Sequence, residues 1–118
     1  MSDLGERHMP NTVAHFDVAG PNLDRLRSFY SEVFGWAVAV RGPGYAAVTT
    51  PAGSADGALI ESEEAALTIG IVVPKLARSL DLAVTQGGAI TMPETDNGWV
   101  VKAQITDPAG NRLTLIQG

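Results

Sequence analysis

Two side chains that can exchange protons lie two residues apart near the start of the chain. His15 and Asp17 fall within Thr12–Ala19, whose alternating apolar and polar residues predict a strand. Because successive side chains of a strand point to opposite faces, this pair shares the face opposite Phe16 and Val18. The two Cβ atoms are then about 7 Å apart, which does not ensure a direct hydrogen bond but lets both groups touch one ligand. An imidazole, which titrates near neutrality, beside a carboxylate indicates acid–base chemistry, polar ligand contacts, or only a hydrogen bond to a neighbour.

The elements that would position this pair follow a pattern that occurs twice. An amphipathic helix is expected from its cap at Asn22 to Gly35, and a second helix from Pro74 to about Gln86. The order of elements is then βαβββ, repeated once. The remaining strands are expected at Trp36–Arg41, Tyr45–Thr50, Gly57–Glu61, Leu67–Val73, Ala89–Glu94, Trp99–Thr106 and Asn111–Gln117.

Matching residues recur in the two halves at a nearly constant offset. His15 corresponds to Thr68 and Leu23 to Leu76, and the Pro-Ala-Gly at 51–53 returns later in the chain. Such self-similarity predicts an internal duplication within one domain. The expected parts are a tail over residues 1–11, a first module over 12–61, a connector over 62–66 and a second module over 67–118.

Composition excludes several classes of function. The 118 residues carry 8 Lys+Arg against 13 Asp+Glu, a net charge of −5, and no basic run interrupts this acidic balance, so nucleic-acid binding is not expected. No apolar stretch approaches the roughly 20 residues of a membrane span, and no secretory leader is visible. The absence of cysteine excludes thiolate metal sites and fits a cytoplasmic location.

Two segments carry a resemblance to a known family. Residues 13–36 (VAHFDVAGPNLDRLRSFYSEVFGW) and 105–117 (ITDPAGNRLTLIQ) resemble the vicinal oxygen chelate superfamily, which includes glyoxalase I, bleomycin-resistance proteins and extradiol dioxygenases. The resemblance implies an α+β fold in which two βαβββ modules form curved sheets around a cleft, with the helices outside. It also implies that modules pair within or between chains, and a homodimer is expected.

The positions that hold metal ligands in that superfamily are mostly occupied here by residues that bind metals poorly. The resemblance matches them to His15, Gly57, Thr68 and Thr114, so only one strong ligand of four remains. No metal or other cofactor is therefore expected. The alternative is a divalent metal ion at His15 and Glu61, with help from a substrate.

Strand alternation predicts which side chains would line the cleft. Lys102 would either pair with Asp17 or hold an anionic group of a substrate. Trp99 and Tyr45 would either stack on a planar ligand or pack at a rim. A mixture of polar, apolar and aromatic groups suits a small organic molecule. With His15 and Asp17 as catalytic candidates, the ligand-binding candidates are Tyr45, Thr68, Trp99, Lys102, Gln104, Arg112 and Thr114.

These features favour a metal-independent protein, similar to the bleomycin-resistance type, that binds a small natural-product-like or antibiotic-like molecule in the inter-module cleft. One alternative is a metal-free isomerase, cyclase or lyase that uses His15 and Asp17 as acid and base. A divalent-metal-dependent glyoxalase- or dioxygenase-type enzyme is a further alternative, disfavoured by Thr68 and Thr114. A fold kept only for contact with another protein is the last alternative, and no residue argues for it.

Overall fold

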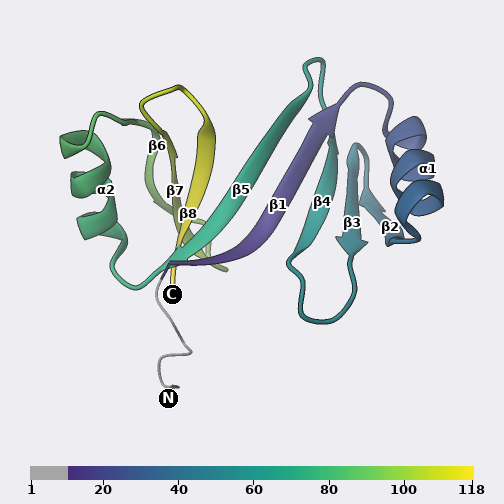
Figure 1. The fold of residues 1–118 in the computed structure, drawn as a ribbon, viewed down its shortest axis with the longest axis horizontal. Coiled ribbons are helices and arrows are strands. Elements are labelled where there is room, and N and C mark those ends of the chain that lie inside the picture. The colour runs from purple at the N-terminus through teal and green to yellow at the C-terminus, as the bar shows by residue number, and fades with distance from the viewer. Residues whose placement is uncertain (1–10) are drawn as a thin grey trace. The chain divides into compact units, whose positions relative to one another are not determined.

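The computed structural model describes residues 11–118 (Figure 1). Apart from Asn11, the tail expected over residues 1–11 lies outside the described residues. The expected α+β fold, with the order βαβββ repeated once, is confirmed. The elements are β1 (Thr12–Gly20), α1 (Leu23–Phe34), β2 (Ala37–Gly42), β3 (Tyr45–Thr49), β4 (Asp56–Glu61), β5 (Ala66–Val73), α2 (Leu76–Thr85), β6 (Ala89–Asp96), β7 (Val101–Thr106) and β8 (Arg112–Gln117).

The described residues form two compact units. The first unit runs from His15 to Ile69, and the second unit comprises Gly70 to Gly118 together with residues 11–14. Neither helix in residues 11–118 is long and apolar enough to cross a membrane.

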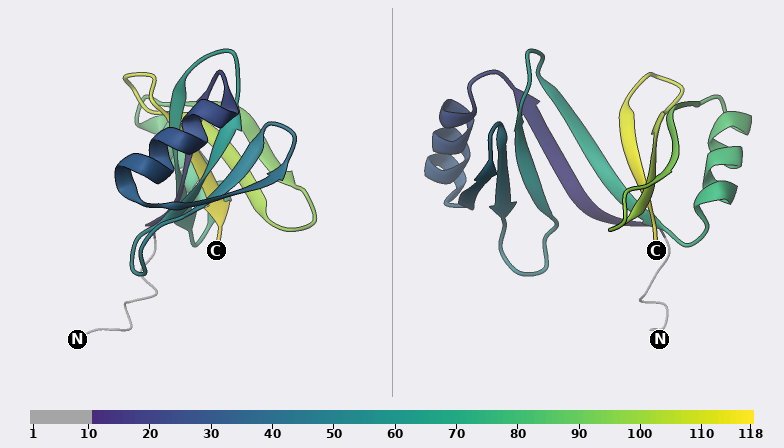
Figure 2. Two further views of the ribbon diagram at one scale, coloured as in Figure 1. Left: turned by 90° about the vertical axis from the view of Figure 1, so that its right-hand side faces the viewer. Right: turned by 180° about the vertical axis from the view of Figure 1, so that it is seen from behind.

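The first unit places its strands in the order β2-β3-β4-β1. Strand β1 runs parallel to β4, whereas β2–β3 and β3–β4 are antiparallel. Helix α1 lies on one side of these strands, as both views of Figure 2 show. The apolar alternate positions of the strands pack beneath the helix, as strand alternation predicts. The buried core of this unit consists of Val18, Leu23, Ala46, Val48 and Leu59.

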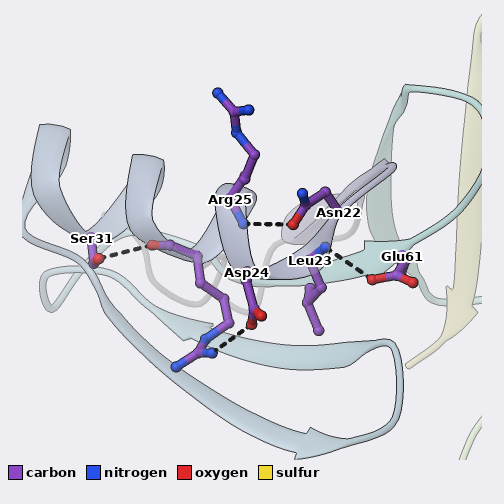
Figure 3. A network of polar contacts seen from close by, with 7 residues as sticks. Asn22, Leu23, Asp24, Arg25, Ser31 and Glu61 are labelled. Atoms are coloured by element: carbon purple, nitrogen blue, oxygen red, sulfur yellow. Dashed lines mark hydrogen bonds and ion pairs between the residues drawn. The ribbon is translucent and has the colours of Figure 1, made fainter.

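Both ends of α1 are fixed by hydrogen bonds, and its expected bounds are confirmed. The side chain of Asn22, the N-cap, accepts a hydrogen bond from Arg25 N at 3.1 Å. The carboxylate of Glu61 accepts another from Leu23 N at 2.9 Å (Figure 3). Gly35 ends the helix with φ 71°, a left-handed conformation that glycine adopts without steric cost. Glu61 therefore ties the end of β4 to the start of the helix.

The second unit places its strands in the order β5-β8-β7-β6, with antiparallel pairing of β6–β7 and β7–β8. Helix α2 begins at Leu76 rather than at Pro74, so the expected start is wrong by two residues. The side chain of Gln117 explains the start, because its Oε1 accepts a hydrogen bond from Leu76 N at 2.8 Å and its Nε2 donates to Pro74 O. The buried core of this unit consists of Val73, Leu76, Leu80, Ala103, Ile105 and Leu115.

The hairpin between β6 and β7 differs from expectation at its tip. Strand β6 continues to Asp96 and β7 begins at Val101, so Trp99 lies in the connecting loop and not on a strand. The reason is local: the side-chain oxygen of Asn97 accepts hydrogen bonds from the backbone N–H groups of Trp99 and Val100. Those N–H groups are then not available to a strand ladder.

Candidate functional site

The polar pair on β1 lies on the sheet face that α1 does not cover. Phe16 and Val18 belong to the core of the first unit, so alternation directs His15 and Asp17 to the opposite face. There the His15 Nε2 and Asp17 Oδ1 atoms are 2.9 Å apart and form a direct hydrogen bond, which the spacing of the residues alone did not ensure. The two side chains are 38 % and 27 % exposed, so solvent reaches both.

This hydrogen bond determines which nitrogen of His15 remains available. An ionised carboxylate only accepts hydrogen bonds, so the Nε2 atom that faces Asp17 carries the hydrogen. In the neutral ring Nδ1 is then an acceptor, able to take a proton or a hydrogen bond from a bound molecule. The arrangement can therefore bind a polar group or act as a general base.

Asp56 is a neighbour of the pair that sequence reasoning missed. It aligns with His15 in the parallel β1–β4 pairing, which places both on the same face. Its Oδ1 accepts hydrogen bonds from Thr50 N at 2.9 Å and from Thr50 Oγ1 at 3.3 Å. The strand expected from Gly57 excluded this residue, whereas β4 begins at Asp56. Asp56 thus adds negative charge to the face while its hydrogen bonds go to Thr50.

Two alanines and a tyrosine continue this face of the sheet. Ala58 stands beside Asp17 in the register, and Ala47 stands beside Ala58. The alanine methyl groups make no hydrogen bonds, so they do not engage the polar atoms of His15 and Asp17. Tyr45 is on the same face, aligned with Ile60, and is 42 % exposed. The face that carries His15 therefore combines the polar pair and Asp56 with a buried Ala58, a half-buried Ala47 and the exposed phenol of Tyr45.

A second polar face belongs to β7 and β8 in the second unit. Gln104 and Thr114 are register partners there, with Gln104 Nε2 3.5 Å from Thr114 Oγ1. Lys102 aligns with Ile116, and Arg112 aligns with Thr106 and is exposed. The structure thus brings Gln104 and Thr114 together, with one cationic side chain toward each end of the ladder. That Lys102 pairs with Asp17 stays a prediction, because these residues belong to different units.

The two other ligand-binding candidates are placed as follows. Thr68 lies on β5, at an alternate position to Ile71 and Val73 of the helix-covered core, and is half-buried. Trp99 is 91 % exposed in the loop between β6 and β7. The ligand contacts expected of both residues stay predictions.

The residues matched to the metal-ligand positions do not all share one face of their strands. Gly57 lies on the core face, where a Cβ atom would stand 2.5 Å from the Phe16 ring, so this matched position does not share the face of His15. Glu61 aligns with Gly20, at the far end of the β1–β4 pairing from His15, and its side chain binds Leu23 N. Within residues 11–118 no three His, Cys, Asp or Glu side chains gather as a metal site would require.

A comparison with known protein families finds a match that includes the segment with the polar pair. The sequence model of the Glyoxalase/Bleomycin resistance protein/Dioxygenase superfamily matches residues 12–115. The chain belongs to this superfamily, which confirms the resemblance drawn from its sequence. A comparison with curated protein sequences finds no match.

Three solved structures illustrate the similarity in fold. The 2,3-dioxygenase LapB from Pseudomonas sp. KL28 is 18 % identical, with a TM-score of 0.68 over 92 % of this chain and 43 % of the dioxygenase. This chain therefore spans less than half the length of the dioxygenase. Methylmalonyl-CoA epimerase from Mycobacterium tuberculosis is 15 % identical, with a TM-score of 0.67 over 89 % of this chain and 86 % of that one. A superfamily member from Vibrio splendidus 12B01 is 16 % identical, with a TM-score of 0.68 over 92 % of this chain and 99 % of that one. At these identities the likeness shows the fold alone.

Proposed function

We propose that this protein binds a small organic molecule on its polar sheet face without a protein-held metal ion. The observation that carries the proposal is the hydrogen-bonded pair of His15 and Asp17, part-exposed on the face that α1 leaves uncovered. Packing does not require this pair, because the core uses the opposite face of β1. A polar pair set in apolar surface is the usual composition of a small-molecule site.

The surroundings of the pair define the kind of molecule that fits. Nδ1 of His15 accepts a hydrogen bond from a hydroxyl or amide of the ligand. On the same face Tyr45 offers an aromatic ring and a phenol, and the half-buried Ala47 offers apolar contact. The carboxylates of Asp17 and Asp56 on the same face disfavour an anionic ligand at this position. The expected ligand is a neutral or modestly polar molecule, of natural-product-like or antibiotic-like character.

A metal-free isomerase, cyclase or lyase is the second candidate, favoured by the geometry of the same pair. Asp17 fixes the histidine tautomer and leaves Nδ1 free, as an imidazole general base requires. Asp17 would hold the ring in this orientation during proton transfer. The similar fold of methylmalonyl-CoA epimerase is an example of isomerisation by a protein of this architecture. Turnover of the bound molecule distinguishes this candidate from a binding protein.

We further propose that the protein acts as a homodimer in the cytoplasm. The superfamily match and the exposure of large apolar side chains support association, since Leu67 is 72 % exposed and Trp99 is 91 % exposed. Two copies related by a two-fold axis would bury such side chains symmetrically.

Native mass spectrometry of the purified protein, with elemental analysis of the same sample, tests the binding proposal. The expected result is a chain free of stoichiometric Zn, Ni, Mn or Fe that gains the mass of an added small organic ligand. About one such metal ion per chain, released when His15 is replaced by Ala, would overturn the metal-independent assignment.

A further inference from the structure

The loop between β6 and β7 carries an Asn-Gly pair that the proposed function does not use. Asn97 precedes Gly98, and both lie beside the exposed Trp99. A glycine nitrogen is the least hindered backbone nucleophile toward a preceding asparagine side chain, because glycine has no Cβ. The other asparagines of the chain precede threonine, leucine and arginine, whose side chains obstruct the same approach.

The side-chain carbonyl of Asn97 is held by two backbone donors. Its Oδ1 accepts hydrogen bonds from Trp99 N at 2.9 Å and from Val100 N at 3.0 Å. Two N–H groups on one carbonyl oxygen form the arrangement of an oxyanion hole, which stabilises the negative charge that develops there during attack on the carbonyl carbon. The loop therefore polarises the Asn97 amide toward a nucleophile.

A carboxylate contacts the nucleophile of the same reaction. Gly98 N donates a hydrogen bond to Asp96 Oδ1 at 2.9 Å. A carboxylate at hydrogen-bond distance from the proton to be removed is placed as a general base. Gly98 has φ 89°, a conformation that side-chain-bearing residues rarely adopt, so the loop geometry also depends on glycine.

We propose that Asn97 is a self-modification site whose deamidation the loop promotes. Gly98 N forms a bond to Asn97 Cγ, and its proton passes to Asp96 and then to Asn97 Nδ2. The Cγ–Nδ2 bond breaks, ammonia leaves, and a cyclic imide remains. Water then adds to either imide carbonyl, which opens the ring to aspartate or isoaspartate. The net reaction consumes one water, releases one ammonia, adds one negative charge and involves no oxidation.

The modification changes the loop that presents Trp99. An isoaspartate inserts an extra methylene into the backbone between Asn97 and Gly98, so the hydrogen bonds to Trp99 N and Val100 N no longer have the same geometry. The new carboxylate also stands beside Asp96, and two like charges repel. The product is thus a more acidic and differently shaped loop, formed slowly and without an enzyme.

Peptide mapping by mass spectrometry tests this proposal on the full chain. The protein is incubated at neutral pH and body temperature, sampled over days and digested, and the amide-to-acid mass change is located by fragmentation. We expect Asn97 to convert faster in the folded protein than in the same chain unfolded in urea. Conversion at Asn22 and Asn111 should stay far behind.

Two matched variants test the role assigned to the carboxylate. Asp96→Ser keeps an oxygen acceptor but removes the base, and it should slow conversion by about tenfold, below the range usual for general bases in enclosed active sites. Asp81→Ser removes the same charge from the exposed surface of α2 and should leave the rate unchanged. Equal rates in the folded and urea-unfolded chain, or equal rates in the two variants, would overturn the proposal.

Discussion

The carboxylate of Asp17 determines what His15 can do. Because it engages Nε2 at 2.9 Å, a ligand meets Nδ1 as the free nitrogen of the neutral ring. A histidine without such a partner would be free to present either nitrogen. The pair is therefore oriented for one direction of proton transfer or one hydrogen bond, which serves both a binding protein and an acid–base enzyme.

Gly57 lies on the core face of β4, opposite the polar face, and its replacement by Ala tests the assignment of faces. A Cβ atom at Gly57 would meet the Phe16 ring at 2.5 Å, so the ring must shift. Overpacking of this kind costs about 1–3 kcal/mol, and we expect Gly57→Ala to lower the free energy of unfolding by that amount. Urea denaturation followed by circular dichroism measures it.

Gly20 provides the matched control on the neighbouring strand. A Cβ atom there finds its nearest neighbour at 3.8 Å, an ordinary van der Waals contact. We expect Gly20→Ala to leave the unfolding midpoint close to that of the unmodified protein. If both variants unfold at the same urea concentration, Phe16 does not pack on Gly57 and the assignment of faces is wrong.

Some of the site could be predicted from the sequence, and the limits have physical causes. Alternation along β1 is a backbone property, so the face of His15 followed directly from the apolar positions Phe16 and Val18. The bond between His15 and Asp17 depends on side-chain rotamers, which Cβ spacing does not determine. Asp56 was missed because a register across parallel strands is a long-range property.

At the scale of elements, the turn between β7 and β8 is organised by one carboxylate. Asp107 Oδ1 accepts hydrogen bonds from Ala109 N and Asn111 N, each at 2.9 Å, and Oδ2 accepts one from Asn111 Nδ2. The hydrogen bond from the Asn111 side chain, followed by the backbone hydrogen bonds, lowers the pKa of Asp107 below its ordinary value of 3.8. The charged form therefore stabilises the turn.

This lowered pKa predicts how stability responds to acid. Because the folded-state pKa lies below the unfolded one, the contribution is present above the unfolded value and is lost as the pH falls through the folded value. We expect Asp107→Ala to melt at a lower temperature than the unmodified protein at neutral pH, and the difference to shrink under strongly acidic conditions. Melting curves over a pH series measure this. A difference independent of pH would contradict the role of the charge.

The two helices show which element boundaries a sequence can define. The ends of α1 were predicted because Asn22 and Gly35 act on the backbone within a few residues. The start of α2 was misplaced because Gln117, from the other end of the second unit, binds the first helical N–H. Trp99 was assigned to a strand because strands are predicted from the pattern of apolar residues. The hydrogen bonds of Asn97 that hold Trp99 in the loop do not change that pattern.

At the scale of the whole molecule, the order of elements was the most predictable property. The repeated βαβββ order and the segments 13–36 and 105–117 led to the superfamily that the match over residues 12–115 confirms. The particular activity did not follow, because one fold carries sites of different chemistry. Solved structures of this architecture include a dioxygenase, an epimerase and a glyoxalase.

Association of two copies is a prediction for the whole molecule. We expect the protein to sediment with twice the mass of its 12.3 kDa chain at micromolar concentration. Exposed apolar side chains such as Leu67 provide the driving force. Sedimentation equilibrium measures the mass directly, and a single-chain mass throughout the micromolar range would contradict the homodimer.

Ligand-induced stabilisation of the unmodified protein and of His15→Ala tests whether the polar face of β1 binds an organic molecule without a metal ion. The melting temperature of each is measured against a panel of neutral and modestly polar organic molecules, with no metal added. A ligand that binds only the folded state raises the melting temperature. We expect at least one compound class to stabilise the unmodified protein, and His15→Ala, which keeps the core intact, to lose about 1–3 kcal/mol of that binding free energy. Compounds that stabilise both proteins equally, or stabilisation that requires an added divalent metal ion, would contradict metal-independent binding at His15.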